Sequence, residues 1–371
     1  MVQINSQRLI HNFLQLVQID SAPRAEAQMA TELLRQLREL GLAAYTDDAG
    51  LRVGGDTGNV IAKLDGSKDK PTIMFSAHMD RVTPGLNIKP VIRDGVIYSD
   101  GTTILAADDV AGIAAIIEAV QSIREQGIAH GPLEFVFTIV EEGGLHGAKN
   151  LDYSQFAADF GYALDSSGPV GSIIVQGPAQ DKIDAVIYGK AAHSGVNPEA
   201  GISAIMAASH GLAQMKTGRI DPETTANVGV IKGGTATNIV TDKVEILAEA
   251  RSLNNDKLDA QSAHMRECLE RGAQVFGARA EVKIGRMYSA FRLDEAAPVV
   301  ELFKRACQQI GLYGYPMPSG GGSDANIFNA NGIPTGNIGI GYQKVHTTEE
   351  HIAVRDLEHV ALLTLALITN A

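Results

Sequence analysis

The sequence predicts an α/β protein built from two domains, and three features support this class. The chain has 371 residues, and at roughly 150 residues per domain two domains are expected. Residues 133–140 (LEFVFTIV) are continuously apolar and lack Gly and Pro, which indicates a strand covered on both faces, as in a mixed or parallel sheet. Residues 181–287 follow the order β-α-β-β-α-β, which is typical of a ferredoxin-like split unit. We therefore expect a mixed-sheet α/β domain interrupted by a smaller inserted domain.

Helices and strands alternate in the first half of the chain. Residues 5–20 and 24–40 show the three-and-four spacing of amphipathic helices, and Gly41 is a natural stop for the second of them. A third helix is expected over residues 109–126, where apolar residues share one face. Strands are expected at residues 59–64, 72–77, 133–140, 162–165 and 172–176.

The pattern changes after Gly177, where longer segments with alternating apolar positions begin. In this part, strands are expected at 181–190, 227–232, 243–252 and 280–287, and helices at 198–216 and 255–276. From about Leu293 the α/β pattern returns, with helices near 295–310 and 353–369, a Gly-rich turn at 319–323 and a strand near 335–340. The predicted domains are residues 1–177 with 291–371, and an inserted domain of residues 178–290.

Composition excludes several classes of function. Lys and Arg number 31 and Asp and Glu 43, which gives a net charge of −12; because this charge repels polyphosphates and no basic stripe offsets it, we expect no nucleic-acid partner. The two cysteines, Cys268 and Cys307, exclude a disulfide framework and favour a reducing, cytoplasmic location. The sequence has no signal pattern and no apolar run near the roughly 20 residues that span a bilayer, so we expect no membrane partner.

Histidines and acidic residues recur where strands are expected to end. His78 and Asp80 follow the strand at 72–77; residues two apart on an extended chain face the same way, so Asp80 could orient His78 as a metal ligand. A surface hydrogen bond between them is the alternative. Asp108 and Asp109 stand side by side before a helix. A capping role explains Asp109 alone, whereas a carboxylate with two oxygens could bridge two cations.

Glu141 and Glu142 follow the apolar strand directly, at the end where ligands gather in open α/β sheets. One could bind a metal while the other accepts a proton from water; a solvated acidic turn is the alternative. Asp165 ends another strand and His346 follows one, and each alone is equally explained as a solvated group. Together these side chains supply ligands for two zinc-like cations, which suits amide hydrolysis without a nucleophilic side chain.

The same segments carry a family resemblance. The chain resembles the co-catalytic zinc exopeptidases, the group of peptidase T, glutamate carboxypeptidases (the carboxypeptidase G type) and the aminoacylase-type deacylases, in HMD at 78–80, AADDVAG at 106–112, EEGG at 141–144, LD at 164–165 and VHTTEE at 345–350. It is most similar to peptidase T-like tripeptidases in GKAAHSGVNPEAGISAI at 189–205, GGTATNIV at 233–240 and EARS at 249–252. The resemblance covers essentially the whole chain, in order.

The resemblance implies a ligand set for two metals in each chain. His78, Asp108 and Asp165 would hold one cation. Asp108, Glu142 and His346 would hold the other, so that Asp108 bridges the pair. The cations implied are two Zn²⁺, with Co²⁺ or Mn²⁺ as alternatives.

The resemblance also implies roles for residues beside the metals. Glu141 would be the general base and would then pass its proton to the leaving amine, and Asp80 would orient His78. Members of the group carry a cis peptide bond after the bridging aspartate, which implies one between Asp108 and Asp109. Relatives often have Lys where this chain has Val110, a departure that concerns local electrostatics rather than metal binding.

In the inserted domain the resemblance implies contacts with substrate. His193 would stabilise the developing oxyanion, and a turn histidine bonded to backbone is the alternative. Asn238 and Arg251 would grip the substrate backbone or its carboxylate, and the fork-shaped guanidinium of Arg251 suits a terminal carboxylate, unless Arg251 forms a plain surface ion pair. The Gly-rich loop at 319–328 would line the substrate cleft, with these residues nearby: Gly320, Gly321 and Asp324.

These assignments imply a catalytic domain of the zinc-exopeptidase fold with an inserted lid and dimerisation domain. The implied activity is that of a peptidase T-like tripeptide aminopeptidase, with a small peptide as substrate and a homodimer formed through the inserted domain. A carboxypeptidase or an N-acyl amino acid deacylase on the same scaffold is the first alternative. A non-catalytic scaffold is disfavoured, because every ligand and the base are present in the sequence.

Overall fold

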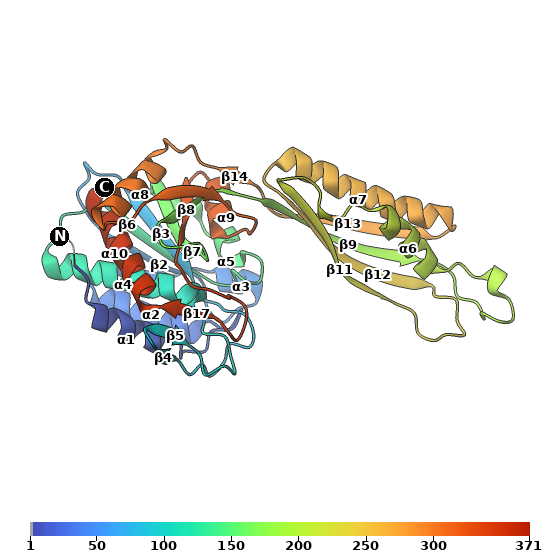
Figure 1. Ribbon diagram of the computed structural model, residues 1–371, viewed down its shortest axis with the longest axis horizontal. Helices are drawn as coiled ribbons and strands as arrows, with labels where there is room; N and C mark the ends of the chain where they lie inside the picture. Colours follow the sequence, from blue (N-terminus) through green and yellow to red (C-terminus); the bar gives the residue numbers. More distant parts are fainter. Residues whose placement is uncertain (1–2) are drawn as a thin grey trace. The chain divides into compact units, whose positions relative to one another are not determined.

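The computed structural model describes residues 3–371, which divide into two compact units (Figure 1). The first unit consists of the described residues up to Val175 together with Arg292–Pro318 and Ser323–Ala371. The second consists of Gln176–Phe291 and the short segment Ser319–Gly322. The second unit is therefore a long insertion in the first. The short Gly-rich segment after β15 is also grouped with it.

A nine-stranded mixed sheet forms the centre of the first unit, in the order β1-β2-β6-β3-β7-β16-β8-β14, with β15 paired to β8. Strand β3 is parallel to β6 and β7, and β16 is parallel to β7, whereas the pairs β1–β2, β2–β6 and β8–β16 are antiparallel. The strands are β1 Ala43–Thr46, β2 Val60–Leu64, β3 Ile73–His78, β6 Leu133–Thr138, β7 Phe160–Ser166, β8 Ser172–Gly177, β14 Phe291–Arg292, β15 Tyr315–Pro318 and β16 Thr335–Gly339. This arrangement confirms the predicted α/β class with a mixed sheet.

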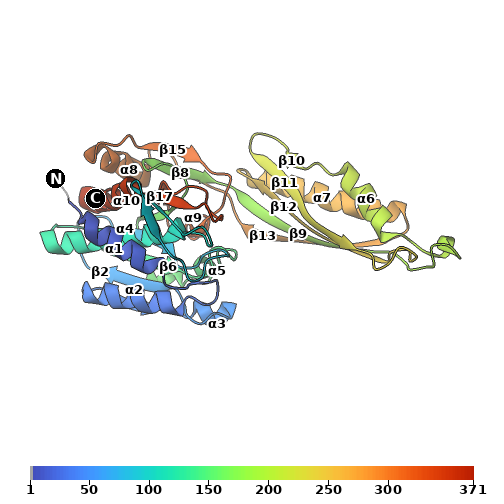
Figure 2. The same ribbon diagram turned by 60° about the horizontal axis from the view of Figure 1, so that its bottom comes forward.

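Helices pack on this sheet and on each other (Figure 2). They are α1 Ser6–Leu16, α2 Ala27–Glu39, α3 Ala49–Val53, α4 Ala107–Gln126, α5 His146–Lys149, α8 Pro298–Gln309, α9 Asp324–Ala330 and α10 Val354–Asn370. Helix α4 lies on β3 and β7 and is covered in turn by α1 and α10, so it is buried on nearly all sides. None of the helices within residues 3–371 combines the length and the apolarity that crossing a membrane requires.

A small three-stranded sheet completes the first unit, in the order β17-β5-β4. Its strands are β4 Val91–Arg93, β5 Val96–Tyr98 and β17 His351–Ala353. Because β17 leads directly into α10, this sheet ties the segment after β16 to the first half of the chain.

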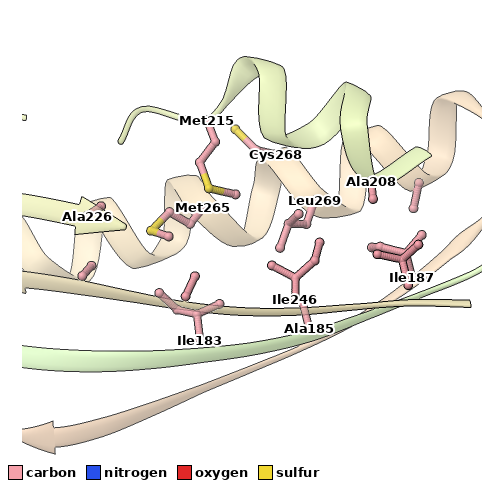
Figure 3. Close-up of a cluster of buried hydrophobic side chains, with 14 of the residues drawn as sticks. Ile183, Ala185, Ile187, Ala208, Met215, Ala226, Ile246, Met265, Cys268 and Leu269 are labelled. Carbon is pink, nitrogen blue, oxygen red and sulfur yellow. The ribbon is translucent and has the colours of Figure 1, made fainter. Parts of the chain in front are cut away.

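The second unit is a five-stranded antiparallel sheet, in the order β10-β11-β12-β9-β13, with two helices on one face (Figure 1). Its elements are β9 Ala179–Tyr188, α6 Ala204–Gln214, β10 Gly218–Arg219, β11 Thr224–Gly233, β12 Lys243–Ser252, α7 Asn255–Val275 and β13 Arg279–Tyr288. Figure 3 shows its core, where Ile183 and Ile246 of the sheet meet Met265 and Leu269 of α7.

Glycines let the two helices of this unit approach closely. A Cβ atom added at Gly272 of α7 would lie 2.6 Å from the Gly211 nitrogen and 2.7 Å from the Ala207 carbonyl oxygen of α6. No side chain fits at that separation, so the contact requires glycine.

The differences from the predicted elements lie mainly in short segments. Strands β1, β4, β5 and β17 and helices α3, α5 and α9 have three to seven residues, which is too short for a periodic signal. The strand predicted at 133–140 ends at Thr138, because Val140 turns with a φ of 50° and its carbonyl accepts from the His146 N–H at 3.0 Å. The helix predicted at 198–216 begins at Ala204, since Pro198–Ala200 forms a 3₁₀ turn.

Candidate metal centre

Six side chains of the first unit meet where its parallel strands end. His78 is the last residue of β3 and is in register with Thr138, the last residue of β6. Glu141 and Glu142 follow β6 after a short turn. The other members are Asp165 near the end of β7, Asp108 at the start of α4 and His346 between β16 and β17. Because parallel strands present their carboxyl ends at one edge of a sheet, residues far apart in sequence come together there.

The two oxygens of Asp108 face two different histidines. Oδ1 lies 3.1 Å from Nε2 of His78, and Oδ2 lies 3.4 Å from Nε2 of His346. Nε2 of His78 is also 3.8 Å from Asp165 Oδ1, and Nε2 of His346 is 2.8 Å from Glu142 Oε1. The carboxylate of Asp108 therefore stands between two sets of possible ligands.

These side chains form compact groups of the size that a metal ion needs. In one group, ligand atoms of His78, Asp108 and Asp165 lie within 4.8 Å of one another, and in a second those of Asp108, Glu142 and His346 do the same. A third such group consists of His78, Glu141 and Glu142. Imidazole nitrogen and carboxylate oxygen are the donors that zinc and similar divalent cations take, so the donor set fits a pair of cations that share Asp108.

The electrostatics of the cluster also favour a pair of divalent cations. Burial raises the pKa of Asp165 and of Glu141 well above the usual value, and neighbouring carboxylates raise both further. Burial alone would lower the pKa of His78, but its hydrogen bond with Asp108 and nearby carboxylates raise it well above the usual value. Crowded, buried carboxylates are costly without cations, and divalent ions would supply that charge.

Protonated histidines balance part of this negative charge. Hydrogen bonds with Asp108 and Glu142 raise the pKa of His346, which is half-exposed, to about 10. Burial would raise the pKa of Asp108, yet its hydrogen bonds with His346 and His78 lower it overall. Histidine binds a metal only in its neutral form, so metal binding here would release protons.

Asp80 contacts His78 through its backbone carbonyl and, at a longer distance, through its carboxylate. Nδ1 of His78 lies 2.9 Å from the Asp80 carbonyl oxygen, whereas the Asp80 carboxylate is 3.6 Å away. That carboxylate instead accepts the N–H groups of Glu141 at 2.8 Å and Glu142 at 3.1 Å, and burial raises its pKa to about 7. The Asp80 carboxylate thus lies within ion-pair range of His78 but beyond hydrogen-bond distance, because β3 ends at His78 and the backbone at Asp80 is no longer part of the strand.

The Asp108–Asp109 peptide bond is cis, as the resemblance implies. Neither residue has helical backbone angles, although both fall in the first turn of α4. The Asp109 carboxylate accepts the backbone N–H of His78 at 3.1 Å. Its explanation as a helix cap is therefore wrong, because its side chain reaches β3 instead.

Sequence reasoning missed three buried residues around the cluster. The Tyr342 hydroxyl lies 3.3 Å from an oxygen of Asp108 and 3.3 Å from one of Asp165. Glu26 accepts the N–H of Val140 at 3.1 Å, just before the glutamate pair. Glu350 accepts three N–H groups around the start of α4, and burial raises its pKa to about 7. Of these three, only Glu350 lies within a motif that the sequence analysis used, VHTTEE. That motif does not distinguish Glu350 from its neighbour Glu349.

The substrate-binding candidates of the inserted domain lie in the second unit. His193 and Asn238 are exposed and sit on adjacent segments, where the Ser194 N–H donates to the Asn238 carbonyl at 3.0 Å. Arg251 lies in β12, and its Nε is 3.1 Å from Oε1 of Glu249. The structure thus gathers the metal-ligand candidates in the first unit and these three residues in the second.

The Gly-rich loop contributes to both units. Gly320 and Gly321 belong to the segment grouped with the second unit, and the space around the Gly320 Cα is open. Asp324 begins α9 in the first unit, where it is buried and accepts the Thr138 hydroxyl at 2.5 Å. Its other oxygen is buried without a hydrogen-bond partner, and burial raises its pKa to about 6.

The chain is similar to known proteins over nearly its whole length. Residues 74–370 match the model of peptidase family M20/M25/M40. The uncharacterized protein YqjE of Bacillus subtilis is 48% identical over 99% of both chains, and peptidase T of Geobacillus thermodenitrificans is 27% identical over 98% of both. Among solved structures, an aminopeptidase PepT from Bacillus cereus is 48% identical with a TM-score of 0.93, over 99% of both chains. A tripeptidase from Staphylococcus aureus is 42% identical with a TM-score of 0.96, over 99% of this chain and 98% of that one.

Proposed function

The chain belongs to peptidase family M20/M25/M40, and on this basis we propose that it is a dinuclear metal exopeptidase that removes the N-terminal residue of tripeptides. One observation carries the proposal: two ligand groups in the first unit share the carboxylate of Asp108. The tripeptide specificity is supported by the likeness to an aminopeptidase and a tripeptidase over nearly the whole chain.

We assign the two ligand groups to two cations. His78, Asp108 and Asp165 would hold one, and Asp108, Glu142 and His346 the other. When bound, such a pair would polarise the scissile carbonyl and lower the pKa of the attacking water. Zn²⁺ is the proposed ion because the donors are imidazole and carboxylate, and metal analysis of the purified protein distinguishes it from Co²⁺ or Mn²⁺.

Glu141 is the proposed general base. It is 9% exposed and lies beside His78 and Glu142, and its backbone is held by the Asp80 carboxylate. Burial raises its pKa well above the usual value, which brings the carboxylate closer to the basicity that proton transfer near neutral pH requires. In the proposed reaction it accepts a proton as water attacks the carbonyl and returns it to the departing amine.

The second unit and the Gly-rich loop would contribute the groups that handle substrate. His193 is the proposed donor to the developing oxyanion, and Asn238 the proposed contact to the peptide backbone. Both are exposed and so available to a ligand. Arg251 would bind a substrate carboxylate in a forked geometry, in place of its present partner Glu249. We also propose that three residues of the Gly-rich loop contact substrate: Gly320, Gly321 and Asp324.

A panel of short peptides, read together with the metal content, tests this function. We expect about two metal equivalents per chain and rapid cleavage of a free tripeptide, with the N-terminal residue released. The N-acetylated tripeptide is the matched substrate, because acetylation removes the ammonium group that an aminopeptidase binds. Cleavage of the acetylated peptide at an equal rate would contradict aminopeptidase action and favour the deacylase or carboxypeptidase alternative.

We also propose that the second unit forms a homodimer. Its sheet has two edges, β13 and the part of β11 beyond the two-residue strand β10, and open edges favour pairing with another chain. Ile205 and Met206 of α6 and Ile231 of β11 are 41%, 53% and 53% exposed. Ile205 lies close to the end of β11, within 3.7 Å of a Cβ placed on Gly234.

Light scattering tests the dimer. The unmodified chain should have twice the monomer mass, and Ile231→Asp should shift it to the monomer because a charge would be buried at the interface. Val275→Asp is the matched control, since Val275 is 59% exposed at the end of α7. A monomeric unmodified chain, or equal dissociation by both variants, would overturn the proposed interface.

A further inference from the structure

The carboxylate of Glu350 makes an unusual set of contacts for a buried acid. Glu350 is 1% exposed, and its Oε2 accepts the N–H groups of Leu105 and Ala106, each at 2.9 Å, while Oε1 accepts that of Asp108 at 3.0 Å. All three donors belong to one short segment more than 240 positions away in the sequence. The Glu350 carboxylate therefore links two distant parts of the chain through these three backbone N–H groups.

The N-cap residue of α4, Ala106, does not cap the start of the helix with its side chain. Ala106 precedes α4 in a left-handed conformation with φ of 59°, and its own side chain cannot accept a hydrogen bond. Helix N-termini leave backbone N–H groups without partners and carry a partial positive charge. A carboxylate placed there satisfies both needs, so Glu350 caps α4 from the opposite end of the chain.

The backbone of Glu350 belongs to the turn that follows His346. The Glu350 N–H donates to the Thr347 carbonyl at 3.1 Å, which closes a tight turn directly after His346. His346 has a φ of 63° and places Nε2 at 2.8 Å from Glu142 and 3.4 Å from Asp108. One turn thus carries both the imidazole and the carboxylate that holds the segment of Asp108.

From this geometry we propose that Glu350 is a positioning residue for the metal pair: it sets the separation between His346 and the bridging carboxylate of Asp108. The proposal rests on the proposed dinuclear centre. The group formed by Asp108, Glu142 and His346 depends on this link most. The group with Asp165 has a separate support, because the Tyr342 hydroxyl lies 3.3 Å from both Asp108 and Asp165.

Glu350→Gln tests the link with little change in volume. An amide has one acceptor oxygen, so whichever way it turns, an NH₂ group faces at least one of the three N–H donors. Glu349→Gln is the matched control: Glu349 is the adjacent residue, is exposed and pairs with Lys344. Both variants remove one carboxylate from the same turn, but only Glu350→Gln touches the segment before α4.

The measurement is a titration of the metal-free protein with Zn²⁺, with the two equivalents resolved. For Glu350→Gln we expect one equivalent to bind about 10- to 100-fold more weakly, as is typical when a partner behind the ligands is lost, and the other to change less. Glu349→Gln should match the unmodified protein. Unchanged binding by Glu350→Gln, or equal weakening of both equivalents, would overturn the proposal.

A second measurement on the unmodified protein covers the case in which Glu350→Gln does not fold. Hydrogen exchange of the metal-free protein should show slow exchange at the amides of Leu105, Ala106 and Asp108, because Glu350 holds them before metal arrives. Exchange at the rate of an unstructured loop would overturn the proposal. Since neither readout depends on turnover, a protein that shows both results but cleaves no peptide would contradict the proposed function and leave this inference standing.

Discussion

The candidate functional residues of the two units are held in different ways. In the first unit they are mostly buried, and buried carboxylates far away in sequence fix their backbone, as Asp80 does for Glu141 and Glu142. In the second unit, His193 and Asn238 are exposed, and each accepts a backbone N–H: the His193 ring that of Gly195 and the Asn238 carbonyl that of Ser194. A site that must assemble several charged ligands requires rigid support, whereas groups that contact a substrate must remain accessible. This difference fits our proposal that the first unit carries the chemistry and the second the recognition of substrate.

Replacing the proposed base should have the largest effect on this comparison. Glu141→Gln keeps the size and one acceptor oxygen of the side chain but cannot take a proton. We expect kcat for a tripeptide to fall by about 10²- to 10⁴-fold while the metal content stays at that of the unmodified protein. Turnover that remains unchanged would remove Glu141 from the mechanism and leave the first unit without an identified base.

The second unit should respond in a different way. His193→Ala removes the proposed oxyanion donor, and the loss of such a donor costs about 10²- to 10³-fold in kcat. Zn²⁺ titration should give the same curve as the unmodified protein, because His193 belongs to the second unit and the ligands to the first. His210→Ala, at another histidine of the second unit, is the control and should retain full activity. A variant of His193 that loses metal would contradict the division of roles.

Metal binding by the first unit should depend on pH with a known sign. The pKa of His346 is raised to about 10, so this histidine stabilises the metal-free fold below its ordinary pKa of about 6.5 and loses that contribution as the pH rises toward 10. Because His346 must lose its proton to bind a cation, metal affinity should rise over the same range, by up to about tenfold per pH unit for one proton.

Calorimetric titrations of metal at several pH values check this expectation. His346→Gln is the control: it should bind the second equivalent weakly and show a smaller pH dependence. Affinity that is constant between about pH 6.5 and 9 would mean that His346 carries no proton in the metal-free protein.

The smallest expected effect separates the stability of the two units. Gly272→Ala places a methyl group against α6, where the nearest atoms are backbone, and overpacking of this kind costs about 1–3 kcal/mol. Gly285→Ala is the control, because nothing lies within 4 Å of a Cβ at that position. Thermal unfolding should show the loss for Gly272→Ala alone, with metal affinity unchanged in both variants. A weaker metal site in Gly272→Ala would show that the two units are coupled.

Much of the fold could be predicted because its long elements carry periodic patterns. The apolar run at 133–140 and the helix face of 109–126 correspond to β6 and α4 with shifts of two residues. The ends of these elements could not be predicted as well. They depend on residues such as Val140 and Ala106, whose positive φ values place ordinary side chains in a conformation that local preference disfavours. Distant carboxylates hold both turns, because Glu26 accepts the N–H of Val140 and Glu350 that of Ala106.

Residue type and position single out the candidate ligands as histidines and acids near expected strand ends or a helix start, and the family resemblance supplies their grouping around two cations. The contacts behind the ligands could not be predicted in this way. Residue spacing suggests that Asp80 orients His78 by its carboxylate, which lies 3.6 Å from Nδ1. Spacing does not predict that the Asp80 carbonyl lies closer to His78 or that the carboxylate accepts the N–H of Glu141. The rule that alternate residues face the same way holds for extended backbone and no longer applies after the strand ends.

The sequence by itself determined which chemical groups are present and the order in which helices and strands place them along the chain, since both follow from side-chain type and short-range periodicity. Only the tertiary structure decided which acid faces which backbone N–H. Glu349 and Glu350 are adjacent and identical in type, yet one is exposed beside Lys344 and the other is buried under α4. Local sequence cannot express that choice, because the N–H groups that Glu350 accepts lie more than 240 residues away and come within reach only when the chain folds.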